Sequence, residues 1–154
     1  MSALLTAIAA QKRRFDPDAT DYFSRIALAG SSITSANKSA VNAFIVGCKT
    51  DGIWSAIKAS CLLAGPDDLT GALVPLVGAA PTNAFFVAGD YSRTTGLKGD
   101  GLVKYLDTNR LATVDPLNNA HVSVFVSELG SDAYIGNIGS HRISLNWTGS
   151  TVKF

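Results

Sequence analysis

The sequence has 154 residues, a usual length for one domain, and 47% of them are hydrophobic. Only 16% are charged, against roughly 25% in an average soluble domain. This ample apolar surface excludes an intrinsically disordered chain. Thirteen Lys and Arg against twelve Asp and Glu leave a net charge of +1, so there is no basic excess to attract nucleic acid phosphates.

The composition also argues against a membrane protein and against export. No stretch reaches the roughly 20 apolar residues of a membrane span. The apolar residues 1–10 resemble a signal sequence, but the basic cluster at 12–14 follows them instead of preceding them. Cys48 and Cys61 are too few for a disulfide scaffold or a zinc ribbon, and both lie in apolar runs where buried, reduced thiols are expected. We expect a protein made in the cytoplasm and not secreted, without membrane contact.

Helix signals dominate the first part of the chain. Residues 2–14 are rich in Ala and Leu and favour a helix. Asp16-Pro17 is a stronger start signal, because Asp caps a helix N-terminus and Pro fits its first turn, and Gly30 can end that helix. The apolar face of this second helix holds Tyr22, Phe23 and Ile26.

A further helix is predicted over residues 35–49, where apolar side chains recur at i, i+3, i+4 and i+7. These side chains are Val41, Phe44, Ile45 and Cys48. After a break at Asp51-Gly52, the helical spacing resumes in Trp54, Ile57 and Cys61. We therefore predict a helical attachment region over residues 1–65. Its packing face consists of Val41, Phe44, Ile45, Trp54 and Ile57.

Residues 66–154 change to short apolar runs separated by Gly, Asn and Asp, which is typical of an antiparallel sandwich. The clearest alternation spans residues 121–128. Further strand candidates are residues 72–77, 85–87, 96–108, 133–136, 142–146 and 151–154. The sequence thus predicts an α+β fold, with N-terminal helices followed by an antiparallel jelly-roll-like β-sandwich. The last run reaches Phe154 without a polar tail, so either neighbouring subunits cover an incomplete sandwich or the chain continues.

Signatures of catalysis or of a metal centre are not found. His121 and His141 have no partner at zinc-site spacing, and the nucleophile motif Gly-x-Ser-x-Gly is absent. The single Glu leaves a paired-carboxylate site to scattered Asp residues. Residues 99–101 lack the phosphate-loop spacing and are interpreted as a loop, and residues 67–68 as a turn or helix cap. We expect no enzymatic activity, no cofactor and no bound metal.

Sugar or calcium binding stays open as the chemical alternative. Oxygen ligands for a hard cation fall at predicted strand ends or loops. They belong to Asp100, Asp107, Asn109 and Asp132. Tyr134 and Trp147 are candidates to stack on a sugar ring, although Trp147 alternates with Leu145 and equally suits a sandwich core.

A longer pattern runs through residues 40–130. It consists of VGCKTDGIWSAIKASC at 46–61, GALVPL at 71–76, APTN at 80–83 and GDYSRTTGLKGDG at 89–101. These stretches resemble the N-terminal signature of a group of tailed-bacteriophage virion proteins. Residues 104–109 and 122–126 are similar to the opening strands of laminin-G-like, concanavalin-type jelly rolls.

This resemblance implies a non-enzymatic structural protein of the phage particle, located in the virion as a tail fibre, spike, neck or collar, or capsid-surface element. It implies a helical region over 1–65 and the front part of a laminin-G-like sandwich over 66–154. Low charge suits extensive interfaces, and particle symmetry repeats one interface many times. We predict a homo-oligomer, first of all a trimer, that docks on other virion proteins through its helices. The alternative function is a carbohydrate-binding module for host surface glycans.

Overall fold

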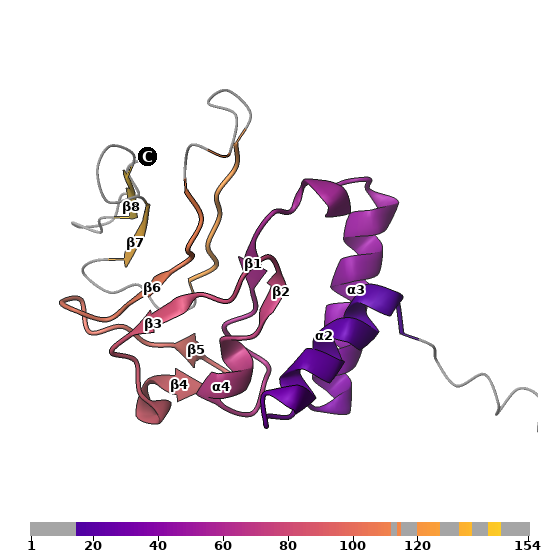
Figure 1. Cartoon of the computed structure of the whole chain (residues 1–154), viewed down its shortest axis with the longest axis horizontal. Coiled ribbons are helices and arrows are strands. Elements are labelled where there is room, and N and C mark those ends of the chain that lie inside the picture. Colours follow the sequence, from indigo (N-terminus) through magenta and orange to yellow (C-terminus); the bar gives the residue numbers. More distant parts are fainter. Residues whose placement is uncertain (1–14, 112–113, 115–119, 127–132, 137–141, 146–154) are drawn as a thin grey trace, which may run out of the picture.

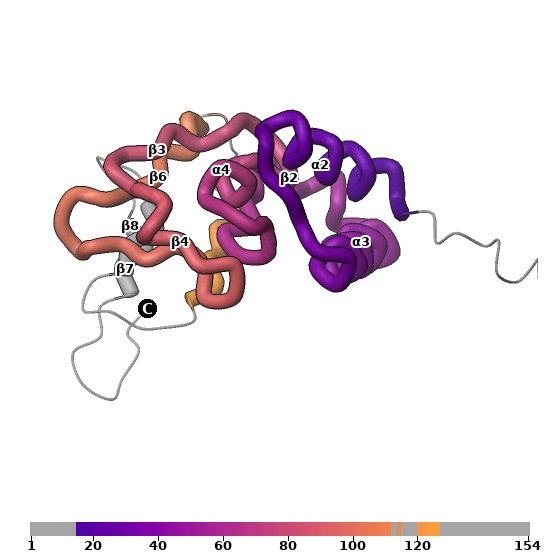
Figure 2. Tube along the Cα trace, turned by 90° about the horizontal axis from the view of Figure 1, so that it is seen from below, coloured from indigo at the N-terminus to yellow at the C-terminus, as the bar shows by residue number. Residues whose placement is uncertain are grey.

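The computed structural model describes residues 15–111, 114, 120–126, 133–136 and 142–145. Two long helices lie against each other, and short strands follow them along the chain (Figure 1). Seen from below, the helices lie on one side and strands β3, β4 and β6 on the other (Figure 2). The mixed α+β class predicted from the sequence is confirmed. Among these residues, none of the helices has the length and hydropathy that a membrane crossing requires.

Helix α2 (Pro17–Leu28) begins where the sequence predicts. The side chain of its N-cap, Asp16, accepts a hydrogen bond from the backbone N–H of Asp18 at 2.9 Å. Tyr22 and Ile26 are buried, as predicted, while Phe23 is only half-buried. The helix ends before Gly30, which has a φ of +81° that favours glycine.

Helix α3 (Ser35–Thr50) confirms the second helix prediction. The Thr34 side chain caps it by accepting a hydrogen bond from the Asn37 N–H at 3.3 Å. The buried stripe consists of Val41, Ile45 and Cys48. Phe44, which the spacing predicts to pack with them, is 47% exposed, because it lies at the edge of the buried stripe.

The helix predicted over residues 54–61 is wrong. Trp54–Ala56 form a single 3-10 turn, η1, and Ile57 after it is extended. Ser60–Cys61 then form strand β1, which pairs antiparallel with strand β2 (Pro75–Val77). Pairing with a distant strand satisfies the backbone groups and overrides the local spacing of apolar residues. Both cysteines are free thiols, Cys48 buried and Cys61 half-buried.

The main core lies between the two helices and this strand pair. It is built from Ala19, Tyr22, Ile26, Ile33, Val41, Ile45 and Leu76. Leu76 belongs to β2, and the backbone of Ile33 forms an antiparallel bridge with buried Pro66. The boundary expected after residue 65 therefore lies between residues that pack together.

The remaining described elements are short. Helix α4 (Leu69–Ala72) is capped by Asp68, whose side chain accepts a hydrogen bond from the Gly71 N–H at 2.9 Å, which confirms the helix-cap interpretation. Of the predicted extended run 72–77, only residues 75–77 are a strand. The other antiparallel pairs are β3 (Thr82–Ala84) with β6 (Tyr105–Asp107), β4 (Tyr91–Ser92) with β5 (Gly96–Leu97), and β7 (Ala133–Gly136) with β8 (Arg142–Leu145).

Two strand predictions fail within the described residues. Residues 85–87 are not a strand, because the Asn83 side chain bonds both backbone groups of Phe86 and Phe85 has a φ of +68°. The 3-10 turn η2 (Ala88–Asp90) follows. Residues 121–126 form no strand with any described segment. The candidates at 2–14 and 151–154 lie outside the described residues, and the run 96–108 is a strand only at β5 and β6.

Candidate functional site

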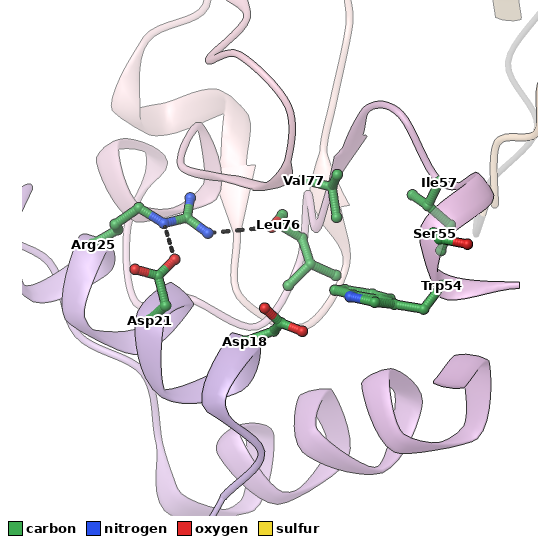
Figure 3. Close-up of a pocket in the computed structure, with 8 residues that line it drawn as sticks. All are labelled: Asp18, Asp21, Arg25, Trp54, Ser55, Ile57, Leu76 and Val77. Atoms are coloured by element: carbon green, nitrogen blue, oxygen red, sulfur yellow. Dashed lines mark hydrogen bonds and ion pairs between the residues drawn. The ribbon is translucent and has the colours of Figure 1, made fainter. Parts of the chain in front are cut away.

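A shallow pocket of about 290 Å³ opens between α2 and the turn η1 (Figure 3). Helix α2 lines one side with Asp18, Asp21 and Arg25. The opposite side is lined by Trp54, Ser55 and Ile57. Strand β2 contributes Leu76 and Val77. The α2 residues reach the same pocket because positions i, i+3 and i+7 share one side of a helix.

Arg25 holds the pocket wall in place. Its Nε donates a hydrogen bond to Asp21 Oδ2 at 2.8 Å, and its Nη2 donates to the Leu76 carbonyl at 3.2 Å. Nη1 donates to the Pro75 carbonyl. The guanidinium carbon also lies 5.6 Å from the centre of the Tyr22 ring. Arg25 thereby joins α2 to β2, so these two walls of the pocket are held together.

Lys49 of α3 joins the acidic start of α2 to the indole of Trp54. Its Nζ lies 2.6 Å from Asp16 Oδ1 and 2.6 Å from Asp18 Oδ2. It also lies 5.9 Å from the centre of the Trp54 ring. The hydrogen bond with Lys49 lowers the pKa of Asp16, and the hydrogen bonds with Asp16 and Asp18 raise the pKa of Lys49. Asp16 and Lys49 therefore stay charged over a wide pH range.

The two sides of the pocket differ in chemistry. One side presents carboxylate oxygens and a guanidinium, and the other presents an indole and aliphatic side chains. Such a combination suits a small ligand with a polar edge and an apolar face. Within the described residues, no three His, Cys, Asp or Glu side chains come together as a metal site.

The structure brings together two of the residues predicted from the sequence. Trp54 and Ile57 both line the pocket and are half-buried. Val41 and Ile45 are buried in the core instead, and Phe44 stands exposed on α3. Of the predicted sugar-stacking residues, Tyr134 lies in β7 and Trp147 lies outside the described residues.

The polar side of the pocket was missed from the sequence. The spacing of Asp18, Asp21 and Arg25 in a helix that starts at Asp16-Pro17 was the available signal. It places three charged side chains on one helix side, but it gives no sign of the partner residue opposite them.

The candidate cation ligands mostly hold loops together. The Asp100 carboxylate accepts hydrogen bonds from the backbone N–H groups of Leu102, Val103 and Lys104 at 3.0, 3.0 and 3.1 Å. These bonds lower the pKa of Asp100 to about 2. Gly101 has a φ of +71°, which confirms the loop interpretation of residues 99–101. Asp107 Oδ1 similarly accepts from the Asn109 N–H at 2.8 Å. Asp132 lies outside the described residues.

Large apolar side chains stand exposed along residues 85–125. They are Phe85, Val87, Leu102, Val103, Tyr105, Leu111, Val114, Val122, Val124 and Phe125. Leu102 is 89% exposed and Phe125 is 93% exposed. We call this set the apolar segment surface. So many exposed apolar side chains along one part of the sequence are typical of a chain that covers them with a partner.

Comparisons of the chain with protein-family models, with curated proteins and with solved structures find no match. Its function is therefore inferred from its own residues, above all from the pocket and the apolar segment surface.

Proposed function

We propose that this chain is a non-enzymatic structural protein of a tailed-bacteriophage particle, which assembles as a homo-oligomer and docks on other virion proteins through its helical region. The sequence resemblance supports the phage particle as its location. The single observation that carries the assembly is the apolar segment surface. Leaving so much apolar area in water is unfavourable, at about 25 cal/mol for each Å², so further copies of the chain are expected to cover it.

The part of this surface best suited to pairing is residues 120–126. This segment is extended, and no hydrogen bond joins its backbone to another described residue. With a period of two, Val122 and Val124 lie on one face of the segment and Ser123 and Phe125 on the other, so both faces present exposed apolar side chains. Backbone groups without partners in such a segment are suited to pair with a strand of another copy. We include in the proposal that residues 66–154 form a laminin-G-like, jelly-roll sandwich once a neighbouring copy is in place.

The docking surface on the helices is narrower than the sequence predicts. Val41 and Ile45 are buried and are not available to a partner. Phe44 is 47% exposed and Val46 is 44% exposed, and both lie on α3. Residues i and i+2 of a helix point to different sides, so these two side chains do not form one patch. We propose that Phe44 is the main apolar contact to another virion protein.

The oligomeric state of the 154-residue chain tests this proposal. Light scattering after size-exclusion chromatography at micromolar concentration should give a multiple of the 16.1 kDa chain mass, with the trimer expected first. Phe125→Ser should yield a folded monomer, since the side chain is 93% exposed and supports no internal packing. Phe44→Ser is the matched control and should leave the oligomer intact. A compact wild-type monomer at this concentration would contradict the proposal.

A module that binds host glycans is the second candidate function. The observation that favours sugar chemistry is the position of Trp54 opposite the carboxylates of α2, rather than Tyr134 or Trp147. This candidate is compatible with a structural role, because a fibre or spike protein can carry a sugar site as well.

A further inference from the structure

The pocket between α2 and η1 has a composition that fits one class of ligand. We propose that it binds a single neutral pyranose ring, with the sugar's C–H face on Trp54 and its hydroxyl groups toward Asp18, Asp21 and Arg25. This goes beyond the structural role proposed above and does not depend on oligomer formation. It also places the sugar on the helical region, whereas the sequence pointed to Tyr134 and Trp147.

The shape of the pocket supports a single sugar ring. A pyranose has an apolar face of C–H groups and an edge of hydroxyl groups, so it needs one apolar and one polar wall. Trp54 and Ile57 supply the apolar wall, while the side of α2 supplies the polar one (Figure 3). The volume of about 290 Å³ lies just below the roughly 300–1,000 Å³ typical of small-molecule sites, as expected for a ligand of one ring. One ring fits, and further rings of a chain would extend into solvent.

Each carboxylate of the pocket has one oxygen that can accept a hydrogen bond from a ligand. Asp21 uses Oδ2 for Arg25, and Asp18 uses Oδ2 for Lys49. Among the described residues, no interaction is found for Oδ1 of either side chain. The side chains are 66% and 48% exposed, so a hydroxyl group can reach them. Hydrogen bonds to a charged acceptor are stronger than those between neutral groups.

The binding groups are held in place before a ligand arrives. Two backbone carbonyls of β2 and Asp21 fix the Arg25 guanidinium. Trp54 packs partly against the core, and the Lys49 ammonium lies over its ring. A site that is already ordered loses little conformational freedom on binding, which favours a weakly interacting ligand such as a sugar.

The charges around the pocket favour a neutral ligand. Asp16, Asp18 and Asp21 stand against Arg25 and Lys49, which leaves one net negative charge, and each carboxylate already contacts a cation. A uronic or sialic acid would be repelled by this charge. A cationic side chain from a partner would have to compete with the two cations that are already bound.

Ligand-observed NMR on the 154-residue chain tests the proposal, with the methyl glycosides of glucose, galactose and N-acetylglucosamine as neutral probes. Glucuronic acid and arginine amide are the charged comparisons. We expect saturable binding of at least one neutral glycoside in the millimolar range, and weaker binding of both charged probes. Asp21→Asn should weaken the binding about tenfold or more, because it removes a charged acceptor from an exposed position.

Matched variants separate the pocket from other sites. Trp54→Phe should weaken binding about tenfold, while Trp147→Phe and the exposed Asp51→Asn should leave it unchanged. Thermal unfolding of each variant shows whether it is folded. If Trp54→Phe does not fold, the binding measured for Asp21→Asn decides whether the pocket is the sugar site. The proposal is overturned by the absence of saturable binding to the wild type, by stronger binding of a charged probe, or by loss of binding in Trp147→Phe alone. None of these results changes the oligomeric state, so the two proposals fail independently.

Discussion

The hydroxyl group of Tyr22 yields a prediction whose sign is unusual for a core substitution. Tyr22 is fully buried, and its hydroxyl finds no hydrogen-bond partner among the described residues. A buried polar group without a partner costs about 1–3 kcal/mol. Tyr22→Phe removes that cost and leaves only a small void, so it should raise the free energy of unfolding by about 1 kcal/mol. For a chain of this length, that is a rise in Tm of about 2–4 °C.

Tyr91 provides the matched control. Its hydroxyl donates a hydrogen bond to the Pro66 carbonyl at 2.6 Å, so Tyr91→Phe should lower the free energy of unfolding by about 1 kcal/mol. Urea unfolding followed by circular dichroism measures both changes. The variants are best compared in the Phe125→Ser background, where dissociation of an oligomer does not contribute. If Tyr22→Phe destabilises as much as Tyr91→Phe, the Tyr22 hydroxyl has a partner and the reasoning is refuted.

Three further outcomes are expected. Burial raises the pKa of Tyr22 and of Tyr91 to about 12. The two phenols ionise near pH 10 in the unfolded chain but not in the folded one, so the free energy of unfolding should fall as the pH rises from 10 to 12. The fall should be less steep in Tyr22→Phe. Gly71→Ala should lower the free energy of unfolding by about 1–3 kcal/mol, because the added Cβ would lie 2.9 Å from Pro66 Cβ. Gly47→Ala in α3 is the control: its Cβ would meet no atom within 4 Å, so it should raise the free energy of unfolding by about 0.5–1 kcal/mol. The pKa of Asp100 is lowered to about 2, so the stabilisation of the folded state by its carboxylate is present above about pH 4 and is lost as the pH falls toward 2. The urea midpoint of Asp100→Asn should therefore be below that of the wild type at pH 7 and should change less between pH 4 and pH 2.

The helices α2 and α3 were predictable because their signals are local. Asp16 and Pro17 act within the first turn of α2, and Gly30 adopts the positive φ that ends the segment. The spacing of Val41, Ile45 and Cys48 identifies the buried stripe of α3. These features depend on residues fewer than two helical turns apart, so no knowledge of the rest of the chain is needed.

The failed predictions depend on distant partners. The spacing of Trp54, Ile57 and Cys61 is compatible with a helix, but Cys61 instead pairs with Pro75 across the β1–β2 ladder. Alternation along residues 121–126 predicts which faces a strand would have, and it carries no information on whether a partner strand is present. Strand pairing is settled by segments far apart in the sequence, so local pattern alone could not decide either case.

The candidate site divides in the same way. The sequence placed Trp54 and Ile57 on the packing face of the helical region, and the structure places both in the lining of the pocket. It did not identify Asp21 and Arg25. Their neighbours in the sequence, Tyr22 and Ile26, predict a core-facing helix, and charged residues on the other side of such a helix are ordinarily solvent-exposed. Contacts between distant segments bring the two sets together: Arg25 bonds the Pro75 and Leu76 carbonyls of β2, and Lys49 of α3 contacts both Asp18 and Trp54.

The bonds that close the helical unit explain why assembly and sugar binding can be tested separately. Arg25 joins α2 to β2, the Asn37 side chain donates to the Gly65 carbonyl at 2.7 Å, and Tyr91 reaches Pro66. All of these bonds join residues within 15–92, and none involves Phe125. A monomeric Phe125→Ser variant should therefore keep the unfolding transition of the helical unit and its affinity for a neutral glycoside. If the variant stays folded but no longer binds the sugar, the pocket needs a contribution from a second copy, and the site would have to be placed at the interface between subunits.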